Sequence, residues 1–127
     1  MRNDIAQRIR LSKQRFLNQN CFGTALFVSG LKEEERQAEW DQTAWRHGQV
    51  YDMIMGLEKA EEPVEGGLII FRNEKRIGHV GVIIEVFPIE IFHRPGHYSA
   101  SERKLLSEIE SAYVKSYPIV EYYFRKD

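Results

Sequence analysis

The feature that most constrains the fold is a change in hydrophobic pattern after Pro63. Beyond it the chain carries three short runs rich in β-branched and aromatic residues: LIIFRNE, HVGVIIEVF and IEIFH. They are separated by EKRIG and by Pro88. Runs of this length and composition, bounded by turn residues, are typical of strands joined by hairpins. The pattern therefore predicts consecutive antiparallel strands between residues 68 and 93.

The sequence before Pro63 has helical rather than strand periodicity. Residues 4–17 favour an amphipathic helix, because apolar side chains recur there at helical spacing among Arg, Lys and Gln. Residues 21–30 favour a buried helix with Asn20 as its N-cap and Gly30 at its end. Residues 32–62 predict one or two further helices. Helices are thus expected to precede the sheet.

After the sheet region the sequence predicts one more helix and one more strand. Residues 101–112 place apolar residues on one side, with Ser101 as a candidate cap, so a helix is expected. PIVEYYFR, which begins at Pro118, is a predicted last strand. The order of elements predicts an α+β fold with N-terminal helices packed on a central antiparallel sheet. At 127 residues the chain fits a single domain, 1–127.

Composition excludes two classes of partner. With 18 basic and 19 acidic residues and a formal net charge of −1, the chain has no basic stripe that would bind a nucleic-acid backbone. No stretch approaches the 18 apolar residues of a membrane span. The opening residues MRNDIAQRIR lack the apolar core of a secretory signal, so a cytoplasmic location is expected, with export by a dedicated system left open. Composition leaves the oligomeric state open.

Three residues could together perform nucleophilic chemistry. Cys21, the only cysteine, is predicted in the first turn of a helix, where the helix dipole and a nearby imidazole would lower the pKa of a thiol. His79 opens the central strand on the same face as Gly81, whose missing side chain would leave room beside it. His93 ends the next strand and could hold the imidazole of His79 in one tautomer. The order Cys, His, His predicts a thiol nucleophile with a base.

Each residue also has an ordinary structural interpretation. A solitary cysteine beside Phe and Ala is commonly an inert buried residue. His79 alone would be a hydrogen-bonded strand histidine, and His93 alone a surface residue beside Arg94. His47 and His97 have no comparable context and are expected to be solvated. Only the combination of Cys21, His79 and His93 favours an enzyme.

These residues lie in segments that resemble the NlpC-type cell-wall peptidases, which are small papain-like cysteine enzymes. NCFGTALFVSG is similar to their D-C-S-G-L-type nucleophile segment, and GGLIIFRNEKRIGHVGVIIE is similar to their G-D-L-x-F-F…G-H-V-G-I-Y segment. IEIFHR resembles the strand end that carries their third polar residue. The spacing of 58 positions from Cys21 to His79 and 14 to His93 is compatible with that fold.

The resemblance implies an activity and roles for the three residues. Cys21 would be the nucleophile, His79 the general base and acid, and His93 the residue that orients His79. The family hydrolyses amide bonds of peptidoglycan stem peptides through a thioester intermediate and uses no cofactor. The implied partner is therefore a peptide or a substrate resembling a peptidoglycan stem.

The chain departs from the family beside the nucleophile. Asn20 stands where the family has Asp, and Phe22 where it has Ser, at positions that help to receive the substrate's free amine. A lost charge-assisted contact of this kind is worth about 1.5–3 kcal/mol. Asn20 and Phe22 are thus the candidate substrate-binding residues, with a changed specificity. Gly67 replaces the Asp of G-D-L, which we interpret as a surface-loop change.

Two other hypotheses remain open at this point. One is a catalytically silent interaction domain of the same fold, in which Trp40, Trp45 and Tyr51 contact a partner; their helical spacing equally fits an ordinary core. The other is a zinc-binding module with Cys21, His79 and either His93 or His97 as ligands. Pro95 and Gly96 between the last two histidines do not allow the helical face that their spacing would need.

Overall fold

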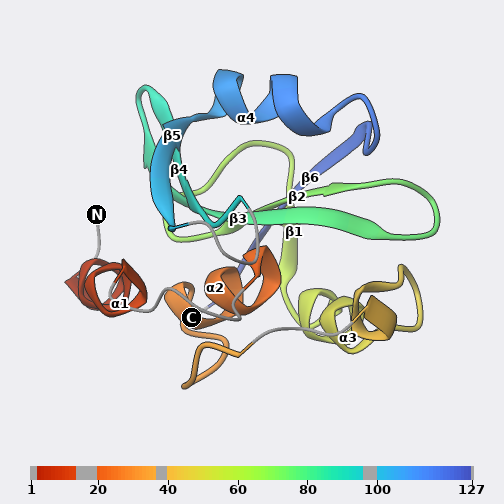
Figure 1. Cartoon of the computed structure of the whole chain (residues 1–127), viewed down its shortest axis with the longest axis horizontal. Helices are drawn as coiled ribbons and strands as arrows, with labels where there is room; N and C mark the ends of the chain where they lie inside the picture. The colour runs from red at the N-terminus through yellow and green to blue at the C-terminus, as the bar shows by residue number, and fades with distance from the viewer. Residues whose placement is uncertain (1–2, 14–19, 37–39, 96–99, 127) are drawn as a thin grey trace.

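The computed structural model describes residues 3–13, 20–36, 40–95 and 100–126. These residues form an α+β fold, as the sequence predicts, in which helices cover both faces of one sheet (Figure 1). The helices are α1 (Asn3–Lys13), α2 (Cys21–Val28), the 3-10 helix η1 (Trp40–Thr43), α3 (Gln49–Met55) and α4 (Leu106–Tyr113). The strands are β1 (Glu58–Ala60), β2 (Leu68–Arg72), β3 (Ile77–Val86), β4 (Ile89–His93), β5 (Glu102–Leu105) and β6 (Ile119–Phe124).

The six-stranded sheet has the order β1-β6-β2-β3-β4-β5, and each neighbouring pair is antiparallel. The predicted consecutive strands are confirmed as β2, β3 and β4, since each pairs with the next along the chain. The predicted last strand is confirmed as β6, which lies between β1 and β2. The C-terminal strand thus belongs to the interior of the sheet.

The central strands are buried on both faces, which explains their nearly continuous apolar sequences. On one face, Val80 and Val82 of β3 pack against α2 and α3, and α1 packs against α2. On the other face, Ile83 of β3 and Ile91 of β4 pack against α4. Figure 1 shows α4 on one side of the sheet and α1, α2 and α3 on the other. Two apolar cores therefore hold the sheet between its helices.

The N-terminal helices follow the sequence prediction. α1 (Asn3–Lys13) covers residues 4–13 of the expected helix, and residues 14–17 lie outside the described part of the chain. α2 begins at Cys21, and the side chain of Asn20 caps it by accepting the Gly23 N–H at 3.0 Å. The chain leaves this helix at Gly30, whose φ of +86° is a conformation that glycine adopts without strain.

The prediction of a helix over residues 101–112 is wrong in its first turn. Residues Glu102–Leu105 form β5, which pairs with the free edge of β4, and α4 begins only at Leu106. Ser101 does not cap α4, whose N-cap is Leu105. The four residues ERKL satisfy their backbone groups in the sheet ladder, a long-range partner that helical periodicity does not reveal. This difference places Glu102 directly opposite His93.

The interpretation of Gly67 as a surface-loop residue is also wrong. Gly67 is buried, and its backbone carbonyl accepts the Ile83 N–H at 2.8 Å. A Cβ at this position would lie 2.6 Å from the Tyr123 carbonyl oxygen and 3.0 Å from that of Val64. The close approach of three backbone segments therefore requires glycine here.

A buried polar cluster fastens α1 and α2 to the end of β4. The Arg94 side chain is fully buried, donates to Thr24 Oγ1 at 2.8 Å, and lies 3.5 Å from Glu35 Oε2. Glu35 Oε2 also accepts hydrogen bonds from Ser12 Oγ at 2.7 Å and Thr24 Oγ1 at 2.6 Å. Because Thr24 lies one turn beyond Cys21 and Arg94 follows His93, this cluster fixes the thiol-bearing helix relative to the histidine-bearing strand.

Residues 32–62 contain η1 and α3, so the one or two helices predicted there are confirmed, but Glu58–Ala60 form the strand β1, so the helical prediction is wrong for those residues. Trp45 is buried and meets Tyr51 edge-on, with ring centroids 4.7 Å apart. These two aromatics thus belong to the core, and the side chain of Trp40 lies outside the description. Within the described residues, no helix has both the length and the apolar character needed to cross a membrane.

Candidate active site

Cys21 lies at the start of α2 with only 8% of its surface exposed. Its thiol is within reach of backbone hydrogen bonds from Val80, from Phe22 and from its own residue, each of which lowers the pKa of the thiol. Val80 immediately follows His79 on β3. The sulfur therefore contacts the backbone of the strand that carries His79.

Burial is nevertheless the largest influence on the pKa of the Cys21 thiol. Removal of the sulfur from water disfavours the thiolate and raises the pKa of Cys21 to about 12, against the lowering by the backbone amides. The expectation of a thiol with a lowered pKa is therefore not met, and Cys21 is a neutral thiol at pH 7. The helix dipole is a smaller effect than full desolvation here.

His79 and His93 form a buried hydrogen-bonded pair. Nε2 of His79 lies 2.8 Å from Nδ1 of His93, and the two rings are nearly perpendicular at 89°. Both side chains are buried, so the interpretation of His93 as a surface residue is wrong. The space beside Gly81 is occupied by the side chain of Ile91 rather than by an imidazole. The predicted orienting contact between the two histidines is thus present.

The two imidazoles are neutral at pH 7. Burial is the larger cause that lowers the pKa of His79 to about 3, and the positive charge that a protonated His93 would carry lowers it further. Burial also lowers the pKa of His93, while the carboxylate of Glu102 opposes that shift. Such a neutral pair has one N–H and one lone pair on each ring, so the direction of its hydrogen bonds determines which nitrogen is free to accept a proton.

Glu102 extends the pair and was missed by the sequence analysis. Its Oε1 lies 3.3 Å from Nε2 of His93, and the two residues are register partners on β5 and β4. The sequence did not indicate this role, because residues 101–112 have the pattern of a single helix. A residue in such a helix would not pair with β4. Because residues 102–105 are a strand paired with β4, Glu102 lies opposite His93 and within hydrogen-bond distance of its ring.

Tyr113, at the end of α4, is the second residue that sequence reasoning missed. Its ring stacks on His79 with centroids 3.9 Å apart and planes 5° from parallel. Burial is the main cause that raises the pKa of Tyr113, followed by the negative charges that Cys21 and Glu102 would carry. Tyr113 therefore lies within electrostatic range of the thiol while covering a face of the imidazole. A tyrosine at a helix end carries no sequence signal for this position.

A cavity of about 260 Å³ adjoins the far end of the histidine pair. His93, Glu102 and Tyr113 contribute to its lining, together with Pro95, Lys104, Glu108, Ile109 and Ala112. Neither Cys21 nor His79 lines it. The cavity thus gives solvent access to Glu102, whose side chain is 40% exposed, while the thiol stays covered.

The two candidate substrate-binding residues lie at the start of α2 but do not face open space. Asn20 is buried and its side-chain oxygen is engaged in capping the helix. Phe22 is half-buried and packs against the core on the α2 face of the sheet. Of the other histidines, His47 is exposed, as expected, and His97 lies outside the described residues.

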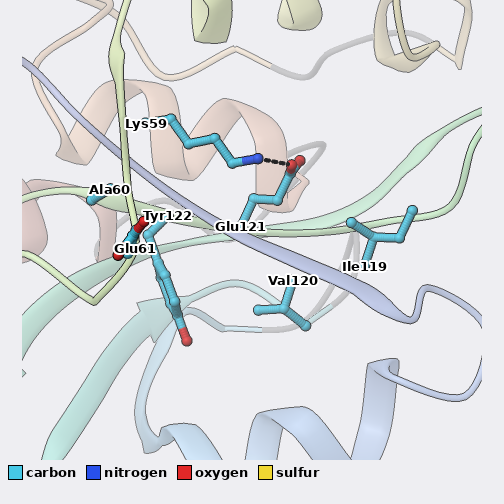
Figure 2. A pocket seen from close by; sticks show the side chains of 7 residues that line it. All are labelled: Lys59, Ala60, Glu61, Ile119, Val120, Glu121 and Tyr122. Atoms are coloured by element: carbon cyan, nitrogen blue, oxygen red, sulfur yellow. Dashed lines mark hydrogen bonds and ion pairs between the residues drawn. The ribbon is translucent and has the colours of Figure 1, made fainter.

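A second pocket, of about 650 Å³, lies at the β1–β6 edge and contains none of the candidate site residues (Figure 2). In Figure 2, Lys59 reaches across to Glu121, and the Nζ to Oε2 distance is 2.7 Å. Arg72 also pairs with Glu121, at 2.6 Å from its Oε1. The Glu121 carboxylate in this pocket is therefore paired with two cations.

No arrangement suited to a metal ion is found in the described part of the chain, where no three His, Cys, Asp or Glu side chains are grouped to bind one. The zinc hypothesis therefore has no support from Cys21, His79 and His93. Comparisons with family models, with curated proteins and with solved structures produced no match to this chain.

Proposed function

We propose that this protein is a cysteine-dependent amide hydrolase or acyl-transfer enzyme with a papain-like, NlpC-type fold, in which Cys21, His79 and His93 form the catalytic triad. The observation that carries the proposal is the buried hydrogen bond between His79 and His93, beside the strand backbone that contacts the only thiol. A thiol, a base and a group that orients the base are the three parts of a catalytic triad, and the proposal assigns them to Cys21, His79 and His93.

The proposed reaction begins with both groups neutral. Sγ of Cys21 attacks the carbonyl carbon of the substrate while its proton passes to His79, which yields a tetrahedral intermediate and an imidazolium. The C–N bond then breaks, the proton moves from His79 to the leaving amine, and a thioester remains on Cys21. Water or another acceptor attacks the thioester while His79 takes its proton; the C–S bond then breaks, His79 returns the proton to Sγ, and the acyl product leaves.

Both groups are neutral before the reaction, so the proposed proton transfer accompanies the attack and does not precede it. A thiol pKa of about 12 and an imidazole pKa of about 3 hold both groups uncharged before substrate arrives. The backbone amide of Cys21, at the positive end of α2, is one donor for the oxyanion of the intermediate. Because Asn20 is engaged in capping and is uncharged, the substrate class would be a peptide amide that needs no carboxylate at this position.

The test is the detection of an acyl group on Cys21. Purified protein is incubated with synthetic stem peptides and with their thioester analogues, and the intact mass is measured after an acid quench. An added mass equal to the acyl group on wild-type protein, absent from Cys21→Ala, is the expected result. Because a general base contributes about 10²–10⁴-fold, His79→Ala should slow acylation by at least about 100-fold.

A matched control for this experiment is His47→Ala, which removes an exposed histidine from another part of the molecule. It should acylate at the wild-type rate. Acylation of His79→Ala at the rate of this control would contradict the proposed role of His79. If no thioester tested acylated the protein, the proposal that it is an enzyme would be contradicted.

The second candidate function is a catalytically silent domain of the same fold, and one observation favours it. The thiol is buried and protonated, and the Tyr113 ring covers a face of His79. In such a protein Cys21 and the histidines would serve as core residues, and Cys21→Ala would leave partner binding unchanged. The acylation experiment separates the two candidates, because a silent domain takes no acyl group from an activated thioester.

A further inference from the structure

The carboxylate of Glu102 ends a chain of hydrogen-bonding groups that starts at His79. The chain runs from Nε2 of His79 to Nδ1 of His93 over 2.8 Å, and from Nε2 of His93 to Oε1 of Glu102 over 3.3 Å. An ionised carboxylate only accepts hydrogen bonds, whereas each neutral imidazole has one donor and one acceptor nitrogen. Glu102 therefore determines which nitrogen donates in each of these two hydrogen bonds.

We propose that Glu102 is a positioning residue that fixes the tautomers of both histidines and so leaves Nδ1 of His79 unprotonated. Because Glu102 must accept, Nε2 of His93 carries the hydrogen. Nδ1 of His93 is then an acceptor, so Nε2 of His79 donates to it. The remaining nitrogen of His79, Nδ1, keeps its lone pair.

The same chain stabilises the charge that forms when His79 takes a proton. Protonation at Nδ1 turns the His79 ring into an imidazolium that still donates through Nε2 to His93. His93 in turn donates to Glu102, so the new positive charge faces a carboxylate through one intervening ring. No proton has to leave the chain, and the charge on Glu102 does not change. Only this part of the inference rests on the proposed function.

The groups around His93 favour this assignment. His93 is 4% exposed and is faced by His79 from β3, by Glu102 and Lys104 from β5, and by Tyr113 from α4. Lys104 opposes protonation of His93, while Glu102 favours it. Glu102 is the carboxylate in hydrogen-bond contact with the ring, and Glu108, in the same cavity, pairs with Lys104 at 3.5 Å.

The tautomers are read directly by long-range ¹H–¹⁵N correlation spectra of ¹⁵N-histidine-labelled protein at pH 7, assigned with His79→Gln and His93→Gln. Wild-type protein should show both rings with hydrogen on Nε2 and none on Nδ1. A charge-assisted hydrogen bond supports a bias of about tenfold or more toward one tautomer. In Glu102→Ala that bias should fall at both rings together, and Glu102→Asp should restore it.

The matched control is Glu108→Ala, which removes a carboxylate from the same cavity without touching either ring; both histidines should keep the wild-type pattern. Hydrogen on Nδ1 of either ring in the wild type, or an unchanged pattern in Glu102→Ala, would overturn the inference. The spectra need no substrate, so this result is independent of acylation. Correct tautomers without acylation would contradict only the proposed function, whereas acylation with the opposite tautomers would contradict only the role of Glu102.

Discussion

The phenol ring of Tyr113 lies face to face with the imidazole of His79, with centroids 3.9 Å apart. The tyrosine comes from α4 and the histidine from β3, so the stack closes the candidate site from the side of the sheet opposite α2. This contact helps to bury His79 and lies within electrostatic range of Cys21. It is therefore the place where access to the site can be changed by a single substitution.

Removal of the Tyr113 ring should expose the site. In Tyr113→Ala, water reaches His79. Because Tyr113 lies within electrostatic range of Cys21, the desolvation of the thiol should also fall, and one unit of decrease in the thiol pKa makes the thiolate about tenfold more abundant. Alkylation of Cys21 by iodoacetamide at pH 8, followed by intact mass, should accelerate at least about tenfold. Tyr113→Phe keeps the stacked ring and should label at the wild-type rate. Equal rates for the alanine variant and wild type would refute a covering role.

Alkylation of wild-type Cys21 should be slow at neutral pH and rise steeply with pH. A thiol with a pKa of about 12 has roughly a thousandth of the thiolate of an ordinary cysteine at pH 7, and the thiolate is the reacting species. The rate should rise about tenfold per pH unit from pH 7 to 10, whereas the rate of a free cysteine levels off near its pKa of about 8.5. A plateau below pH 9 in the folded protein would contradict the burial of the thiol.

The stability of the protein should fall in mild acid because of His79. Its pKa is lowered in the folded state to about 3, from an ordinary value of 6.5. The unfolded chain then binds more protons below pH 6.5, so the stabilisation is complete above 6.5 and is lost as pH falls toward 3. At about 1.4 kcal/mol per unit, urea unfolding should lose roughly 2 kcal/mol between pH 6.5 and 5.

Two variants test whether the His79 imidazole causes this pH dependence of the free energy of unfolding. His79→Gln should show a shallower dependence of the free energy of unfolding on pH over that interval. His47→Gln, at an exposed position, should follow the wild type. A slope in His79→Gln as steep as in the wild type would show that other groups cause the acid sensitivity.

Removal of only one partner of the buried ion pair between Arg94 and Glu35 should strongly destabilise the fold. Arg94→Met leaves the carboxylate of Glu35 buried without its cation, and such single removals cost about 3–5 kcal/mol. The double variant Arg94→Met, Glu35→Leu removes both charges and should recover much of that loss. Urea unfolding of the two single variants and the double variant measures the coupling. Additive losses would show that the two side chains act independently.

Replacement of Gly67 by Asp, the residue at this position in the NlpC-type peptidases that the sequence resembles, should destabilise the protein. Gly67→Ala places a Cβ 2.6 Å from the Tyr123 carbonyl oxygen, and overpacking of this kind costs about 1–3 kcal/mol. Gly67→Asp should cost more, because it also buries a charge. Gly56→Ala is the matched control, since its new Cβ would lie at 3.4 Å from the nearest atom in an exposed position. A Gly67→Asp protein with wild-type thermal stability would contradict the observed packing.

The sequence predicted the parts of the fold that depend on local pattern. The capped helix at Cys21 could be read from Asn20 and the apolar run after it, because capping is a contact between neighbours in sequence. The hairpins β2–β3–β4 could be read from short apolar runs between turn residues, since the strands pair in sequence order. The nearness of His79 and His93 followed from that pairing.

Long-range packing decided the rest. β5 was hidden within a helical pattern, because only the open edge of β4 makes ERKL a strand, and with it Glu102 became the partner of His93. Tyr113 reached His79 only through the way α4 lies on the sheet. The protonation of Cys21 and His79 likewise depends on how completely the folded chain removes them from water. Sequence by itself determined which groups could react; tertiary structure decided their partners and charge, since desolvation and contact across the chain have no local signature.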